Sequence, residues 1–345
     1  MDDVSKLQSD VLTLATPEGR KVGTRGHDVV KAYLLERIDA LGLQPYQGET
    51  AELPYESSGQ TFSNLVAVVP GKDRSLAPIL IGAHYDSVID SYCADDNAAA
   101  VAIALLAAER LPALGLQRDV VIALFDAEEP PYFHSADMGS TRFYREQRRP
   151  AGFHCALVMD LVGHDVELPL PGLEALSGQM AGLLFMTGAE SHAALAQVVE
   201  NCLPGPELPL IASLNRNVGD MSDHHIFRLN AVPFLFLSCG RWQHYHQETD
   251  TPDRLNYQKM ERISAFLVQL CQTLATTDLP RDDQAATPQS LEDGVTDTTS
   301  LEIKLIERAF GGSLDSFLAV IGSGPLASRG DLDQLAFRLQ GFFEL

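Results

Sequence analysis

Hydrophobic residues along the chain follow two different spacings, which predict where strands and helices lie. Short runs that are almost entirely apolar predict buried strands at residues 64–69, 78–83, 120–125, 155–161, 183–187 and 232–237. Apolar residues three or four positions apart predict helices at residues 29–41, 97–111, 191–201 and 256–277. Alternation of apolar strands with helices predicts an α/β fold, in which helices cover both faces of a mostly parallel central sheet.

The last part of the chain changes in character. Residues 279–300 lose the apolar periodicity and are rich in Asp, Thr, Gln and Pro, which predicts a polar linker. Helical spacing returns in residues 301–345. We therefore expect a large domain over residues 1–278 and a C-terminal helical extension. The extension would pack on that domain or pair subunits into a homo-oligomer.

Composition and charge exclude several functional classes. The 345 residues are 45% hydrophobic, as in an ordinary globular protein, and the net charge of −22 argues against a nucleic-acid partner. The first residues lack the pattern of a secretory signal, and we read no apolar run as a membrane span, so we expect a cytoplasmic protein without membrane contact. Five cysteines without close pairing predict free thiols.

Acidic and histidine residues follow several of the predicted strands. The motifs are His84-Tyr-Asp86, Asp95-Asp96-Asn97, Glu128-Glu129, Asp160 and His244-Tyr-His246. Because the carboxyl ends of parallel strands meet at one edge of a sheet, we expect the motifs that end strands to share a pocket. Imidazoles together with several carboxylates are the ligand set of a site for two divalent metals, above all zinc.

The spacing within each motif indicates a role. Asp86 follows His84 by two residues, where a carboxylate can hold the second imidazole nitrogen of a metal ligand. Three consecutive helix-capping residues exceed what one helix needs, so we expect Asp95 to bridge two metals and Asp96 to support it. Asp160 ends an apolar run, where an ionised carboxylate needs a cation.

Adjacent carboxylates at a buried strand end repel each other unless cations separate them. We therefore expect Glu129 to bind a metal. Glu128 would be the general base, taking a proton from a metal-held water and passing it to the departing amine.

The residues alone leave two points open in the later motifs. Either His244 or His246 could bind metal, and Asp250 could orient the ligand. Asp223, beside two histidines, could be an acid of the site or an ordinary helix cap.

These motifs resemble those of the zinc aminopeptidases typified by the bacterial double-zinc leucine aminopeptidase, in a superfamily that includes glutamate carboxypeptidase and glutaminyl cyclase. The resemblance covers roughly residues 15–278 and rests on His-x-Asp-Ser, Ala-Asp-Asp-Asn, Glu-Glu, Met-Asp and a His four residues before Asp-Thr-Pro-Asp. It implies two zinc ions, with the following ligands: His84 and Asp160 on one ion, Glu129 and His246 on the other, and Asp95 between them. It also implies a cis peptide bond between Asp95 and Asp96.

The implied activity is hydrolysis of the N-terminal residue of a peptide with a free amino end, by a metal-bound hydroxide with Glu128 as base. Cobalt or manganese could replace zinc. The longer segment after Glu129 (Pro-Pro-Tyr-Phe-His-Ser-Ala-Asp-Met) is also similar to glutaminyl cyclase, which uses one zinc to close an N-terminal glutamine. The paired acids Asp95-Asp96 favour a second metal, so we expect an aminopeptidase, with glutaminyl-peptide cyclotransferase as the alternative.

Overall fold

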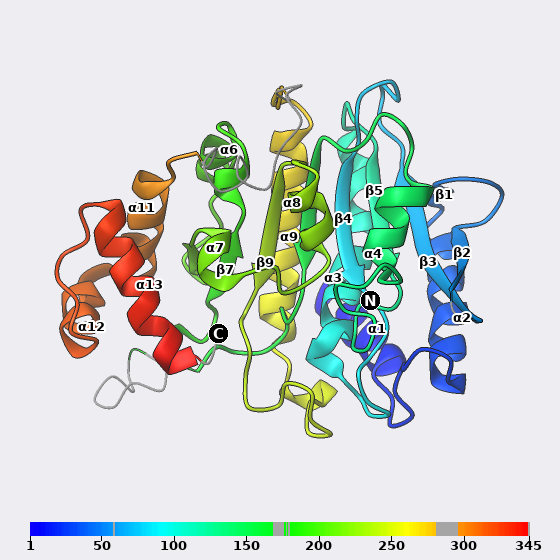
Figure 1. Cartoon of the computed structure of the whole chain (residues 1–345), viewed down its shortest axis with the longest axis horizontal. Helices are drawn as coiled ribbons and strands as arrows, with labels where there is room; N and C mark the ends of the chain where they lie inside the picture. The colour runs from blue at the N-terminus through cyan, green and yellow to red at the C-terminus, as the bar shows by residue number, and fades with distance from the viewer. Residues whose placement is uncertain (58, 168–175, 177, 179, 281–295, 344–345) are drawn as a thin grey trace.

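One mixed sheet runs through the middle of the molecule in a computed structural model of the chain (Figure 1). The structure describes residues 1–57, 59–167, 176, 178, 180–280 and 296–343. The strands of these residues are β1 (Gln44–Pro45), β2 (Glu52–Ser57), β3 (Gln60–Val69), β4 (Ile79–His84), β5 (Val120–Phe125), β6 (Cys155–Met159), β7 (Leu184–Thr187), β8 (Leu210–Ala212) and β9 (Phe234–Ser238). Their order is β1-β3-β5-β4-β6-β9-β7-β8, with β2 paired to β3.

The centre of the sheet is parallel and its flanks are not. Strands β5, β4, β6 and β9 run in the same direction, whereas β3 and β7 are antiparallel to their central neighbours. The carboxyl ends of four neighbouring strands therefore meet at one edge. The predicted α/β fold is confirmed, and the antiparallel flanking strands make the sheet mixed rather than purely parallel.

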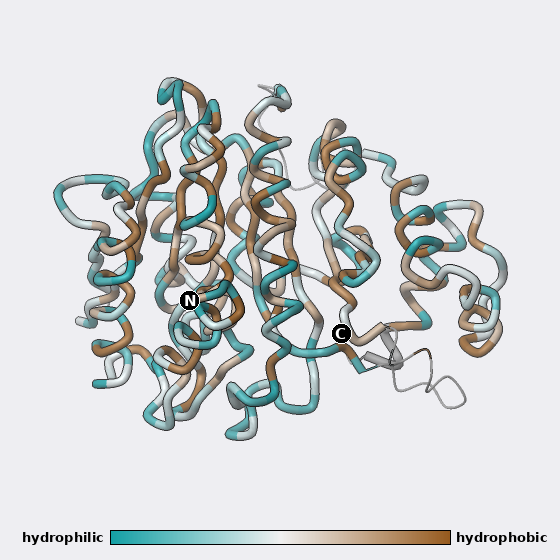
Figure 2. Tube along the Cα trace, turned by 180° about the vertical axis from the view of Figure 1, so that it is seen from behind, coloured by the Kyte–Doolittle hydropathy of each residue, from teal (hydrophilic) through white to brown (hydrophobic). Residues whose placement is uncertain are grey.

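Helices cover both faces of this sheet because its strands are apolar on both sides. Residues Ile79 and Ile81 of β4 pack into one core cluster, and Leu80 between them packs into the other. The first face is covered by α1 (Asp3–Leu14), α2 (Arg25–Ala40), α3 (Ala99–Arg110), α6 (Leu195–Asn201) and α9 (Tyr257–Leu274). The second face is covered by α4 (Gly139–Arg142) and α8 (His224–Leu229). Figure 2 shows hydrophobic and hydrophilic stretches alternating along the helices seen from behind.

The sequence explains where the long helices begin and end. The Thr24 side chain accepts a hydrogen bond from the backbone N–H of His27 at the start of α2, and Gly42 follows its end with a φ of 67°. Within the described residues, the stretch Ala94–Leu114, which includes α3, has the length and hydropathy of a membrane span. However, 72% of its most apolar window is buried inside the structure, as in a core helix.

The C-terminal helices pack on the β8 edge of the sheet. They are α11 (Thr299–Phe310), α12 (Leu314–Val320) and α13 (Arg329–Phe343). Leu301 and Leu305 of α11 belong to the same core cluster as the strands. Most of the predicted linker, residues 281–295, lies outside the described residues.

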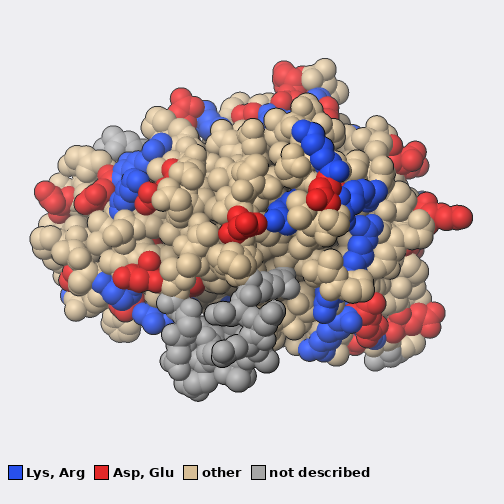
Figure 3. All heavy atoms as spheres, turned by 90° about the horizontal axis from the view of Figure 1, so that it is seen from above, with Lys and Arg blue, Asp and Glu red and all other residues tan. Residues whose placement is uncertain are grey.

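The surface and the cysteines agree with an ordinary globular protein. On the face seen in Figure 3, acidic side chains border the basic ones. All five cysteines are buried free thiols, as predicted.

Candidate metal centre

Six ionisable side chains converge beyond the carboxyl ends of the central strands. They are His84, Asp96, Glu128, Glu129, Asp160 and His246, called the metal centre below. His84 is the last residue of β4, the two glutamates follow β5, and Asp160 follows β6. His246 lies on the loop after β9. The parallel centre of the sheet thus brings together residues that are far apart in the sequence.

His84 lies at one side of the metal centre, surrounded by carboxylates. Its Nε2 atom lies 3.3 Å from Asp96 Oδ1, 3.7 Å from Asp160 Oδ1 and 3.8 Å from Glu128 Oε2. His84 with Glu128 and Asp160, and His84 with Asp96 and Glu129, are two groups whose ligand atoms lie within 4.8 Å of one another.

Asp96 connects the two sides of the centre. Its Oδ2 lies 3.1 Å from Nε2 of His246, and that nitrogen lies 3.3 Å from Glu129 Oε2. The two oxygens of one carboxylate therefore face two different imidazoles, which is the arrangement needed to bridge two cations.

The polar atoms at this centre fit a divalent metal. Four buried atoms have no hydrogen-bond partner among the described residues: His84 Nε2, Glu129 Oε1, Asp160 Oδ1 and His246 Nε2. Leaving a buried polar atom unsatisfied costs about 1–3 kcal/mol, so four in one place call for a common partner. Imidazole nitrogens and carboxylate oxygens are ligands that zinc accepts.

Electrostatics at the centre also call for cations. Burial and the charge of Asp96 raise the pKa of Glu129 to about 8, and burial raises the pKa of Glu128 well above its usual range. Burial lowers the pKa of His246, but the nearby carboxylates of Asp96 and Glu129, 3.1 and 3.3 Å from its Nε2, outweigh burial and raise the value to about 10. Without metal, the cluster therefore retains protons that divalent ions would displace.

The prediction that Asp95 bridges the metals is wrong. Asp95 Oδ1 accepts hydrogen bonds from the backbone N–H groups of Gly163 and His164, at 2.6 and 3.1 Å. Its Oδ2 lies 2.6 Å from Nδ1 of His164. Asp95 thus faces a different loop, and Asp96 is the acid of the pair whose carboxylate faces both His84 and His246.

The backbone explains this exchange of roles. Residues Ala94–Ala98 form a π-helical turn in which Asp96 leaves helical geometry, with φ −111° and ψ 87°. Neighbouring side chains consequently point to opposite sides of the turn. The cis peptide bond in this turn is Asp96–Asn97, so the expectation of a cis bond between Asp95 and Asp96 is also wrong.

Asp86 and Asp250 support the centre through backbone groups. Asp86 Oδ1 lies 3.3 Å from His84 Nδ1, and the Asp86 carboxylate accepts hydrogen bonds from the backbone N–H groups of Glu128 and Glu129, both at 3.1 Å. Asp250 accepts hydrogen bonds from the backbone N–H groups of Asp95 and Asp96. The expectation that Asp250 orients a metal-binding histidine is therefore wrong, because its carboxylate holds the turn that carries Asp96.

Asp223 lies at the start of α8 but does not act as its cap. Its side chain makes no capping hydrogen bond, and both carboxylate oxygens are buried without a partner of ordinary geometry among the described residues. Burial raises the pKa of Asp223 to about 7. The side chain is a buried acid close enough to His84 and Asp160 to interact with their charges.

Sequence analysis missed one residue that holds the centre in place. Arg20 is 0% exposed, and its guanidinium donates hydrogen bonds to five backbone carbonyls. The acceptors are Leu14, Tyr85, Tyr92, Cys93 and Asp96. Arg20 lies in a polar stretch between helices, where no periodicity marks it as buried.

A stacking contact links Asp95 to the loop of His246. His164, paired with Asp95, stacks on Trp242 with ring centroids 4.5 Å apart and an interplanar angle of 10°. Trp242 precedes His246 by four residues on the same loop. Asp95 thus contributes to the position of a metal-centre residue that it does not contact.

Comparison with known proteins identifies the family of this chain. The pattern of "Peptidase family M28" matches residues 64–271, a range that contains all six residues of the metal centre. The "Uncharacterized protein YfbL" of Escherichia coli (strain K12) is 31% identical over 231 residues, which is 60% of this chain and 69% of that protein.

Three solved structures share the fold at 15–17% identity. A Zn-dependent exopeptidase from Parabacteroides distasonis has a TM-score of 0.60 at 15% identity, covering 78% of this chain and 97% of that one. The glutaminyl cyclase of Tannerella forsythia has a TM-score of 0.60 at 16% identity, covering 80% and 99%. The LapA aminopeptidase of Legionella pneumophila has a TM-score of 0.62 at 17% identity, covering 80% and 73%. By the match over residues 64–271 and the likeness to YfbL, the chain belongs to peptidase family M28.

Proposed function

We propose that this protein is a zinc-dependent aminopeptidase that removes the N-terminal residue of a peptide with a free amino end. The observation that carries the proposal is the position of Asp96, whose two carboxylate oxygens face His84 on one side and His246 on the other. One carboxylate between two imidazoles, with three further acids around them, provides ligands for two metal ions.

The ligands divide into two sets around Asp96. His84 and Asp160 would hold one zinc, and Glu129 and His246 would hold the other. When bound, the zinc ions would polarise the substrate carbonyl and lower the pKa of a water molecule.

Glu128 is not assigned to either zinc, so its carboxylate is available to transfer protons. It is buried, and its Oε2 lies 3.8 Å from Nε2 of His84, next to the place where the reacting groups would meet. We assign it as the base that takes a proton from the attacking water and returns it to the departing amine. Burial raises the pKa of Glu128 above its usual range, which favours uptake of a proton.

Replacing Glu128 by Gln tests this assignment, because Gln keeps the shape of the side chain but cannot accept the proton. We expect kcat to fall by at least about a hundredfold, the lower end for general acid–base catalysis, with two zinc ions per chain retained. Elemental analysis must accompany the assay, since Glu128 also lies in one of the two groups of potential ligands. A variant that keeps full activity, or that loses a zinc, would overturn the role.

The alternative is a glutaminyl-peptide cyclotransferase with one zinc. The observation in its favour is Asp223, a buried acid that is not among the six residues of the metal centre, together with the likeness to a glutaminyl cyclase. We prefer the peptidase because the position of Asp96 between His84 and His246 offers a second metal a complete set of ligands.

A further inference from the structure

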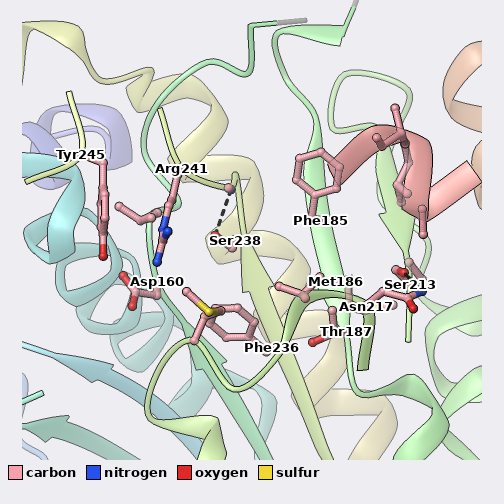
Figure 4. A pocket seen from close by; sticks show the side chains of 18 of the residues that line it. Asp160, Phe185, Met186, Thr187, Ser213, Asn217, Phe236, Ser238, Arg241 and Tyr245 are labelled. Atoms are coloured by element: carbon pink, nitrogen blue, oxygen red, sulfur yellow. Dashed lines mark hydrogen bonds between the residues drawn. The ribbon is translucent and has the colours of Figure 1, made fainter. Parts of the chain in front are cut away.

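A cavity of about 300 Å³ extends from the metal centre toward the C-terminal helices. Its inner end is lined by metal-centre residues, among them Asp160 and Glu129. Its middle is lined by side chains of the last strands, including Phe185, Met186 and Phe236. Figure 4 shows Asp160, Arg241 and Tyr245 on one side of this cavity and Phe185, beside α13, on the other.

The far wall of the cavity comes from the C-terminal extension. It is formed by apolar residues of α11 and α13, called the far wall below: Ile306, Leu332, Leu335, Ala336 and Leu339. All five lie beyond residues 64–271, where the family pattern matches. The far wall is therefore a feature of this chain outside the part that identifies its family.

Polar contacts hold α11 and α13 in place as a wall. Glu302 of α11 is buried and accepts hydrogen bonds from Arg329 of α13 at 2.8 and 2.7 Å. Arg216 of α7 (Asn215–Val218) donates to Asp333 of α13 at 2.9 Å. The fork-to-carboxylate contact between Arg329 and Glu302 fixes the orientation of α13 on α11, and α11 in turn packs on β8.

The volume and lining of the cavity indicate what it receives. It is about twice the 150 Å³ cavity that takes up a benzene ring in an engineered protein. An aminopeptidase accepts one residue before the bond that it cuts, and the rest of the peptide must extend into solvent. A largely apolar cavity next to the reacting centre is therefore placed to receive the side chain of that first residue.

We propose that α11 and α13 determine substrate specificity, and that the far wall limits the size of a large apolar side chain on the N-terminal residue. This inference rests on the proposed aminopeptidase activity. Each methylene buried in the cavity is expected to raise kcat/KM about fourfold, until the side chain reaches the far wall.

A series of variants on α13 tests the proposal. Ala336→Phe fills the outer end of the cavity, Leu335→Ala enlarges it, and Phe337→Ala is the matched control because Phe337 is 78% exposed on the same helix. The substrates are amino-acid 4-nitroanilides whose unbranched side chains lengthen from methyl to octyl. Thermal unfolding of each variant confirms that it folds.

The wild type and the control should show the same rise of kcat/KM with side-chain length. Ala336→Phe should lower kcat/KM for the octyl substrate at least about tenfold and change the methyl substrate less than about twofold. Leu335→Ala should shift the preference toward the longest side chain. An equal effect of Ala336→Phe on all substrates, or no effect of length in the folded Leu335→Ala variant, would overturn the proposal.

A binding experiment separates this proposal from the proposed function. Alkyl hydroxamates, which bind zinc through the head group, are titrated into the zinc-loaded protein by calorimetry, with chains from acetyl to octanoyl. Tighter binding of the longer chains that is lost in Ala336→Phe would support the far wall even if no peptide is cleaved. Affinity independent of chain length would overturn the far wall even if peptides are cleaved.

Discussion

Arg20 donates a hydrogen bond from Nη2 to the backbone carbonyl of Asp96, 3.2 Å away, from a position without exposed surface. The same guanidinium nitrogen donates to the carbonyl of Cys93 at 2.8 Å. One side chain thus restrains the backbone at Cys93 and at Asp96, the residue that we propose as the bridge between the metals. A ligand must be held within a fraction of an ångström to serve two metals, and Arg20 provides part of that restraint.

Replacing Arg20 by Met should destabilise the protein and weaken zinc binding. The variant leaves several buried carbonyls without a donor, so we expect the free energy of unfolding to fall by about 3 kcal/mol or more. Chemical denaturation of the zinc-loaded protein measures this. Lys21→Met is the control, because the neighbouring Lys21 is exposed and its side chain has no described partner. Similar losses in both variants would contradict the account.

Asp96 and Asp95 should respond differently to the same change. Asp96→Asn removes a negative charge from between two imidazoles, so we expect fewer than two zinc ions per chain and a loss of activity of at least about a thousandfold. Asp95→Asn weakens the contact with His164 and should cost about 1–3 kcal/mol of stability while zinc content stays at two. Elemental analysis of both variants decides; the opposite ranking would restore Asp95 as the bridge.

Trp242 should affect one metal more than the other. Trp242→Ala removes the stacking contact that connects His164 with the loop of His246, and His84 is not on that loop. We expect the affinity for one zinc to fall about 10–100-fold, the range for residues that support ligands, and the affinity for the other to change little. Competition with a chelator measures both. Gln243→Ala, at an exposed position on the same loop, should behave like the wild type.

Zinc should stabilise the protein more at higher pH. The pKa values of Glu129, about 8, and of Asp223, about 7, lie above those of the unfolded chain, so the metal-free folded protein binds more protons than the unfolded one. The contribution of these two groups to the free energy of unfolding of the metal-free protein therefore falls as the pH rises from about 5 to 8. His246, whose pKa is raised to about 10, also stabilises the metal-free protein less as the pH rises above the ordinary pKa of histidine. Zinc would displace the protons of its ligands Glu129 and His246, and its charge would lower the pKa of Asp223, so the penalty would be removed.

Thermal unfolding with and without zinc, at about pH 6 and about pH 8, checks this linkage. The rise in Tm on adding zinc should be larger at the higher pH. Taking the difference between the two forms cancels titrating groups far from the centre, such as His154, whose pKa burial lowers to about 4. An equal rise at both pH values would show that the metal centre does not hold these protons.

The sequence was sufficient to predict a residue of the candidate site where the position of that residue follows from the strand that it ends. His84 and Asp160 were placed together because each ends an apolar strand and such ends meet at one edge of a parallel sheet. The choice between Asp95 and Asp96 was not predictable in this way. It depends on the dihedral angles of one turn, and adjacent residues differ there by the side to which they point.

Contacts between residues far apart in the sequence could not be predicted from the sequence patterns either. Arg20 contacts carbonyls that lie up to 76 residues away, and no periodic pattern encodes such a contact. The helical spacing of the last residues predicted the helices of the extension. It did not predict that Ile306 and Leu335 would border a cavity shared with Asp160, because that depends on how α11 and α13 dock on the sheet.

One assay tests the central claim most directly. The zinc-loaded protein is incubated in parallel with a peptide that begins with leucine and one that begins with glutamine, and the products are identified by mass spectrometry. A zinc aminopeptidase should release the free first amino acid and leave a shortened peptide with a new amino end. Loss of ammonia from the glutamine peptide, with the leucine peptide intact, would contradict the account and identify a cyclase.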